Sequence, residues 1–246
     1  MNYQTNKNHA DTRKPLPKLD ITVHLASDGW RQSIIDLAGP ENADNSQLLA
    51  ALDLQASVVS DIKKIVTMRN HQSSDITQGM HLKQVASSYD KLMSTYDARE
   101  KSATASLKKL TANIQKDFES QLGFSSQQNE EIRTLFRSKS QEQQIGDIQT
   151  AIESGDGILL NAILNTNPYA VGLTAKQQAA YRAQAMKRHT PGLVKMQAAI
   201  DKTLNLLSNV TAGLVESGDS ITARSIREGY QRQEEIARQA AAGANF

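Results

Sequence analysis

The chain has 246 residues, of which 39% are hydrophobic and only 4% aromatic, and its formal net charge at pH 7 is +2. This length allows one large domain or two small ones, and the scarcity of aromatic residues disfavours a deep, aromatic-lined pocket. Because the chain has no cysteine, disulfides, zinc-thiolate sites and thiol nucleophiles are excluded.

The N-terminal segment is predicted to be an extended polar arm. Residues 1–20 are rich in Asn, Lys, Asp and Thr, a composition that buries too little apolar surface to order itself. Ile21, Val23 and Leu25 then alternate with polar residues, which fits either a short strand or an extended segment that docks on a partner. Trp30 lies in a short helix expected before Gly39-Pro40, and we expect it to pin the arm to the body of the protein.

Two helices are expected next, joined by a short polar turn. Asn45 or Ser46 can cap a helix whose apolar residues repeat at helical spacing to about residue 69. After the polar turn at 70–75, Asp75 or Thr77 can start the next helix.

The stretch 82–122 is the dominant feature of the sequence. Its apolar residues recur three, four or seven positions apart and so follow one face of a helix. They are Leu82, Val85, Tyr89, Leu92, Tyr96, Ala103, Leu107, Leu110, Ile114 and Phe118. At about 1.5 Å per residue this helix would be roughly 60 Å long. We expect it to form an antiparallel hairpin with the preceding helix, and other helices to cover its apolar face.

Shorter helices are predicted after Gly123, which can end the long helix in a left-handed conformation. Ser125 or Ser126 should start the next helix, and the polar stretch 138–144 should break or kink it. The turn Gly155-Asp156-Gly157 precedes a short apolar helix, and Thr174 can cap another.

A second long apolar stripe runs from Leu193 to about residue 211 and predicts a well-formed helix. Gly213 and Gly218 are expected to loosen its end, and Glu216-Ser217-Gly218-Asp219 to act as a helix stop. The remaining tail is helical by propensity but has few apolar positions, so we expect it to dock on another subunit or to fray.

These elements predict an all-α protein, an elongated helical bundle with a long hairpin. The expected segments are an extended arm with a short helix at 1–45, the hairpin at 46–123, a bundle of shorter helices at 124–215, and a helical tail at 216–246. The apolar stripes fit both an intramolecular bundle and an oligomeric coiled coil, and both interpretations remain open.

Sequence motifs of catalysis and metal binding are missing. There is no His-x-x-x-His pair, no phosphate-binding glycine loop and no Gly-x-Ser-x-Gly motif. We therefore expect no enzyme activity, no cofactor and no metal ion.

A basic stretch from residue 176 to 195 is the most suggestive chemical feature, because it contains no Asp or Glu. Its cations are Lys176, Arg182, Lys187, Arg188 and Lys195. They could contact phosphates or an acidic partner. However, the aromatic platform and helix-turn-helix pattern of many nucleic-acid-binding proteins are missing. Nucleic acid is therefore the alternative partner.

Between residues 148 and 193, the sequence reads Ala-Ile-Glu-Ser-Gly-Asp (151–156), Leu-Asn-Ala-Ile-Leu (160–164), Asn-Pro-Tyr (167–169) and Gly-Leu-Thr (172–174), followed by Lys187-Arg188-His189. This segment, about a fifth of the chain, resembles uncharacterised helix-rich proteins of tailed bacteriophages and prophages. The resemblance implies a virion or virion-assembly protein that forms homo-oligomers or binds other virion proteins, and it carries no catalytic residue. We expect a structural protein, with nucleic-acid binding as the alternative.

Neither a signal peptide nor a membrane span is expected, because residues 1–14 are polar and no run of 18 apolar residues occurs. The expected location is the host cytoplasm and, for a phage protein, the virion.

Overall fold

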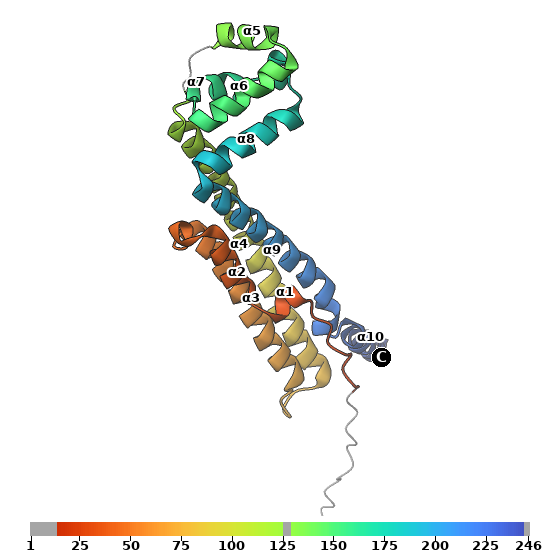
Figure 1. The fold of residues 1–246 in the computed structure, drawn as a ribbon. Coiled ribbons are helices and arrows are strands. Elements are labelled where there is room, and N and C mark those ends of the chain that lie inside the picture. Colours follow the sequence, from red (N-terminus) through yellow and green to blue (C-terminus); the bar gives the residue numbers. More distant parts are fainter. Residues whose placement is uncertain (1–13, 125–128, 244–246) are drawn as a thin grey trace, which may run out of the picture. The chain divides into compact units, whose positions relative to one another are not determined.

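The computed structural model of the protein describes residues 14–124 and 129–243. Within these residues the chain forms ten α-helices and two short 3-10 helices, and no strand. The predicted all-α class is therefore confirmed (Figure 1). None of the described helices is both long and apolar enough to cross a membrane.

The chain divides into two compact units. Unit 1 comprises Met1–Gly29, Ala51–Ser102 and Asn205–Phe246, and unit 2 comprises Trp30–Ala50 and Ala103–Leu204. Both units therefore contain pieces that are distant in the sequence.

Three long helices contribute residues to both units, so the units do not follow the four segments expected from the sequence. These helices are α3 (Ser46–Asn70), α4 (Gln78–Gln121) and α9 (Pro191–Ile221). The long helix predicted for residues 82–122 is confirmed as α4, which has 44 residues.

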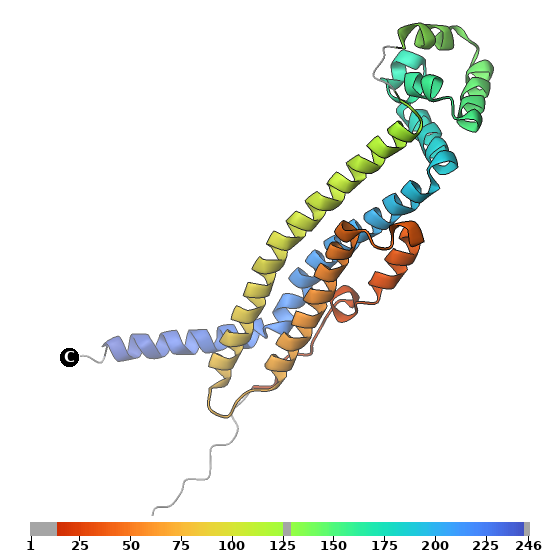
Figure 2. The same ribbon diagram turned by 90° about the vertical axis from the view of Figure 1, so that its left-hand side faces the viewer.

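In unit 1, α3, α4 and α9 lie side by side (Figures 1 and 2). The buried Tyr89 hydroxyl of α4 donates to the main-chain carbonyl of Leu214 in α9. Seven residues further along α4, the Tyr96 hydroxyl donates to the carbonyl of Leu207 at 2.9 Å. Because the partners are also seven residues apart but in the opposite order, α4 and α9 run antiparallel and the two tyrosines fix their register.

The helix α9 continues through Gly213 and Gly218 to Ile221, so the predicted loosening and the predicted stop at 216–219 are wrong. These glycines are sites of close packing. A Cβ atom at Gly213 would overlap the hydroxyl of Thr22, and one at Gly218 would lie 3.2 Å from Cε1 of Tyr89. The absence of a side chain at these two glycines lets Thr22 and Tyr89 pack closely against α9, and it does not end the helix.

The strand interpretation of residues 21–25 is wrong, because a single helical turn, α1 (Val23–Ala26), forms there. The buried Gln55 side chain holds the end of this turn by donating to the carbonyls of His24 at 3.1 Å and Ser27 at 2.9 Å. The preceding residues 14–22 have no regular secondary structure. The segment does dock, but on α9 of its own chain, where Ser220 Oγ accepts from the Asp20 amide at 3.1 Å.

Predicted helix boundaries in the hairpin agree closely with the structure. Asn45 caps α3 by accepting from the amides of Gln47 and Leu48 at 3.1 and 3.0 Å. Thr77 accepts from the Met80 amide at the start of α4. The left-handed Gly123 (φ 68°) follows the end of α4.

Unit 2 contains most of the shorter helices (Figure 1). They are α2 (Trp30–Ala38), η1 (Pro40–Asn42), α5 (Glu130–Ser138), α6 (Gln141–Ser154), α7 (Gly157–Leu164), η2 (Pro168–Val171) and α8 (Ala175–His189). Its core includes Phe118 and Phe136, and the ring of Phe124 meets that of Phe118 edge-on with centroids 5.6 Å apart.

Two boundaries in unit 2 differ from expectation. The predicted helix starts at Ser125 and Ser126 lie outside the described residues, and α5 begins at Glu130. The predicted break at 138–144 is shorter, because Ser140 and Gln143 form a capping box that starts α6 at Gln141.

The C-terminal tail forms α10 (Arg224–Gly243). Its first half docks on α4 of the same unit, where the Tyr230 hydroxyl donates to Gln78 Oε1 at 2.7 Å. Lys83 and Glu234 form an ion pair at 2.5 Å. The tail thus has partners within its own chain.

Candidate interaction surfaces

The basic stretch 176–195 covers α8 and the start of α9. Thr174 starts α8 through a capping box with Gln177, so the predicted cap is confirmed. Lys176, Lys187 and Arg188 are exposed. At about 100° per residue, Lys176 and Lys187 lie on the same side of α8, roughly 16 Å apart, while Arg188 lies about 100° further round. The exposed cations are therefore spread around α8.

Arg182 differs from these cations because it packs inside unit 2. Its Nη2 donates to the carbonyl of Leu164 at 2.7 Å, and its Nη1 lies 3.5 Å from Glu119 Oε1. Its guanidinium also lies 5.9 Å from the centre of the Phe118 ring. Burial lowers the pKa of Arg182, and Glu119 partly offsets that effect. Arg182 therefore holds α8 to its neighbours and is not part of an exposed basic face.

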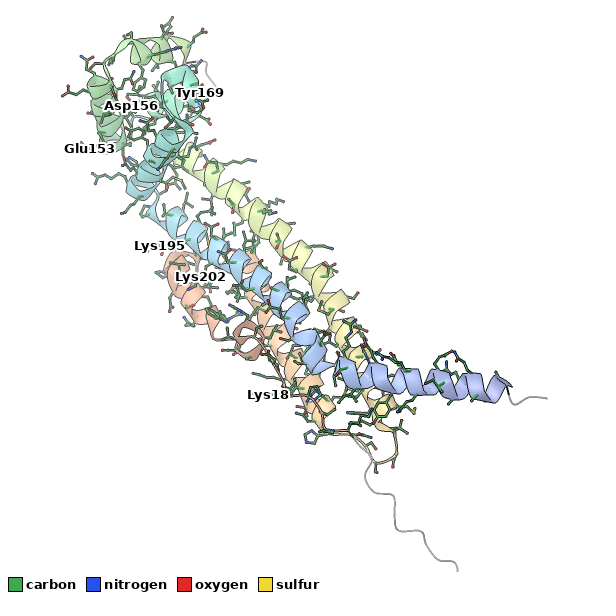
Figure 3. The ribbon with its side chains drawn as sticks, turned by 90° about the vertical axis from the view of Figure 1, so that its right-hand side faces the viewer. Lys18, Glu153, Asp156, Tyr169, Lys195 and Lys202 are labelled. Atoms are coloured by element: carbon green, nitrogen blue, oxygen red, sulfur yellow. The ribbon has the colours of Figure 1, made fainter. Side chains whose placement is uncertain are left out.

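Lys195 also has an intramolecular partner, since its Nζ lies 3.3 Å from Glu41 Oε1. A main-chain hydrogen bond, and then Lys195, lower the pKa of Glu41. Lys202, two turns along α9, donates to Ser33 Oγ at 3.3 Å. Figure 3 labels both lysines on α9. They connect α9 to α2 and η1 across more than 150 positions of sequence, which no local pattern could reveal.

Four N-terminal residues were predicted to make docking contacts, Trp30 with the body of the protein and Ile21, Val23 and Leu25 with a partner, and they lie in different places. Leu25 is fully buried in unit 1, and Ile21 is half-buried there. Trp30 is half-buried at the start of α2 in unit 2. Val23, with 58% of its surface exposed, keeps the most accessible side chain of the four.

Unit 1 also has an apolar groove between α3 and α4, which was not predicted from the sequence. The groove has a volume of about 430 Å³. Its apolar lining consists of Leu54, Val58, Ile65, Met68, Leu92 and Tyr96. The sequence signal for this groove is that the apolar stripes of α3 and α4 are wider than the buried core requires. Met68 and Leu92 widen these stripes, because they lie beside buried positions.

Charged residues around this α3–α4 groove are predominantly basic. Lys64, Lys91 and Arg99 line it together with one acid, Asp61, which pairs with Lys64 at 2.8 Å. The groove therefore combines apolar walls with a net positive rim, which suits an amphipathic helix with acidic residues.

Unit 2 has an acidic helix face on α6. This helix contains Glu142, Asp147 and Glu153 and no Lys or Arg. Asp147 pairs with Lys139 at 2.6 Å. One side of α6 is exposed and consists of Glu142, Ile145, Gln149 and Glu153. Its apolar residue, Ile145, has 44% of its surface accessible. Figure 3 shows Glu153 near the end of α6, before Asp156. We call these four residues the α6 face.

Among the described residues, no three His, Asp or Glu side chains come close enough to share a metal ion. Comparisons of the chain with protein-family models, with curated proteins and with solved structures give no match.

Proposed function

We propose that the chain is a non-enzymatic structural or assembly protein that acts by helix packing, and that it is a bacteriophage virion or virion-assembly component. The α3–α4 groove is the observation that carries the first part. Its apolar walls lie between two long helices, and Met68 and Leu92 are the partly exposed residues among them. Such a groove is a standard site for a further helix. The phage assignment rests on the resemblance of residues 148–193.

The α6 face of a second copy is the occupant we propose for the groove. Its acids Glu142 and Glu153 complement the basic rim, and exposed Ile145 offers an apolar anchor. If the grooves of two copies faced each other instead, Lys91 and Arg99 of one copy would lie close to the same cations of the other, which is unfavourable. A groove that binds a different surface of the next copy gives head-to-tail assembly, which forms rings or filaments.

Cysteine cross-linking tests this contact cleanly, because the chain has no cysteine of its own. Ser88→Cys places a thiol in the groove, and Gln149→Cys places one on the α6 face. When the two variants are mixed under mild oxidation, we expect a mixed disulfide dimer. Ser87→Cys is the matched control, since Ser87 is exposed on α4 but does not line the groove.

Equal cross-linking by Ser87→Cys, or none with either variant, would contradict the proposed contact. If disulfides between two copies of the Ser88→Cys variant predominate, the interface is groove to groove, and the head-to-tail arrangement is overturned.

Nucleic-acid binding is the second candidate function, favoured by the exposure of Lys176, Lys187 and Arg188. If it holds, the triple Glu variant of these residues should bind DNA more weakly and with a salt slope lower by roughly three. The control reverses three exposed cations of α3 and α4, Lys63, Lys108 and Lys109. Binding that is unchanged by the first variant, or equally reduced by both, would exclude a specific role for α8. Arg182 is left intact because it supports the fold.

A further inference from the structure

A second cavity of unit 1 lies at the turn between α3 and α4, away from the groove. It has a volume of about 700 Å³. The N-terminal segment lines it with Lys14, the end of α3 with Arg69, the turn with His71, and the start of α4 with Gln78 and His81. It is thus an open cavity lined by four segments at the tip of the hairpin.

Arg69 is the unusual residue of this cavity, because it is a buried cation with only 4% of its surface exposed. Its Nη2 donates to the Pro17 carbonyl at 2.5 Å, and its Nη1 donates to Asn70 Oδ1 at 3.1 Å. Its Nε is buried and has no hydrogen-bond partner. None of the ion pairs of the described residues involves Arg69.

A buried guanidinium without a counter-charge is unfavourable. Burial accordingly lowers the pKa of Arg69. The Nη2 of Arg69 anchors the N-terminal segment by donating to the Pro17 carbonyl, and its Nη1 donates to Asn70. Neither partner supplies negative charge, so the anchoring role leaves the charge of Arg69 uncompensated.

The other lining residues add hydrogen-bond donors and no negative charge. His71 contributes an imidazole, and none of the described lining residues is Asp or Glu. Lys14 also lines the cavity, but its ammonium group lies 5.2 Å from the centre of the Tyr230 ring of α10. The Nδ1 of His71 lies 2.8 Å from the Thr67 carbonyl, which leaves its Nε2 for another partner. The buried His81 places its Nε2 3.3 Å from the Arg69 carbonyl and holds the two sides of the turn together.

We propose that this cavity binds a small oxyanion, a phosphate or a phosphate monoester, with Arg69 as its counter-charge. Guanidinium groups bind phosphate oxygens through strong, charge-assisted hydrogen bonds. The several acceptor oxygens of a phosphate can be shared between Arg69 and His71. The start of α4 favours an anion, whereas the end of α3 opposes one, so the charge of Arg69 must dominate the site.

Binding would connect the N-terminal segment to the hairpin tip, because both line the cavity. The proposed ligand therefore stabilises unit 1. This inference does not depend on the groove or on self-assembly.

Titration calorimetry on the full chain tests the site, with inorganic phosphate and phenyl phosphate as separate probes in a phosphate-free buffer of constant ionic strength. We expect both probes to bind, and the tighter one to show whether the natural ligand is free phosphate or a monoester. Arg69→Gln should weaken binding by about tenfold or more, since a charged hydrogen bond is lost. His71→Gln should weaken binding by a smaller factor.

Lys63→Gln is the matched control, because it removes an exposed cation of α3 that does not line the cavity. If Arg69→Gln fails to fold, His71→Gln still tests the site, since its side chain is on the surface. The proposal is overturned if the wild-type chain binds neither probe at millimolar concentration, or if Lys63→Gln weakens binding as much as His71→Gln does.

Discussion

Gly157 and Gly146 are two glycines of unit 2 with opposite surroundings. A Cβ atom at Gly157 would overlap the main-chain carbonyl oxygen of Leu122, whereas one at Gly146 would meet nothing within 4 Å. We expect Gly157→Ala to destabilise the protein by roughly 3 kcal/mol, because main-chain atoms must move. Gly146→Ala should stabilise it by about 0.5 kcal/mol, because alanine restricts the unfolded chain.

Urea unfolding of both variants measures this difference. Equal stabilities would mean that Gly157 is not a packing site.

Tyr89 and Tyr96 make the stability of unit 1 depend on pH in the alkaline range. Burial raises the pKa of each hydroxyl from 10.0 to about 12. Because the folded state holds these protons more tightly than the unfolded state, their contribution is fully present below pH 10.0 and is lost as pH rises through about 12. The free energy of unfolding should fall by about 1.4 kcal/mol per pH unit for each tyrosine.

The double variant Tyr89→Phe/Tyr96→Phe isolates this effect. It should be less stable than the wild type near neutral pH, by about 1 kcal/mol for each lost hydrogen bond. Its loss of stability between pH 10 and 12 should be smaller than that of the wild type. Parallel pH profiles for the two proteins would show that these hydroxyls are not buried donors.

Single residues were predictable where their partners are close in the sequence. Asn45 and Thr174 cap helices through amides two or three residues away, so composition and spacing identify them. Arg182 looked like part of a basic surface because its partners, Glu119 and Leu164, are 63 and 18 residues away. Gly213 was expected to loosen the end of α9 for the same reason, since Thr22, its packing partner, is far away along the chain.

At the scale of a helix, the capping box of α8 should contribute measurably to stability. Thr174 Oγ1 accepts from the Gln177 amide at 3.2 Å. Thr174→Ala should therefore cost about 1 kcal/mol, while Thr174→Ser should cost little. Asn129 precedes α5 without a side-chain capping bond, so Asn129→Ala is a control expected to have almost no effect. Thermal unfolding followed by circular dichroism compares the three variants; similar losses at both helix starts would refute the capping role.

Long elements were predicted well because periodicity over many residues is a strong signal, as in α4 and α9. The short segment 21–25 was predicted to be a strand or an extended docking segment, because three alternating apolar residues are typical of extended backbone, and the helical turn was not predicted. Its conformation depends on Gln55, whose side chain holds the carbonyls of His24 and Ser27. Such a distant hydrogen bond overrides local preference.

At the scale of the whole molecule, the sequence predicted the fold class but not the two units. Linear segments were expected, whereas Trp30–Ala50 belongs with Ala103–Leu204. The ion pair between Lys195 and Glu41 is one contact that joins these pieces. Surface features were likewise predictable only where their residues are close in the sequence. The basic stretch was visible in the sequence, but the α3–α4 groove requires two helices to be placed side by side.

Sedimentation velocity over a range of protein concentrations measures self-assembly most directly. For a chain of 27.0 kDa, we expect a mass that exceeds the monomer and increases with concentration, because head-to-tail contacts add copies. Lys91→Glu/Arg99→Glu should shift the protein toward monomer, whereas Lys108→Glu/Lys109→Glu should not, because these exposed lysines do not line the groove. A mass of 27.0 kDa at every concentration would contradict the proposed assembly.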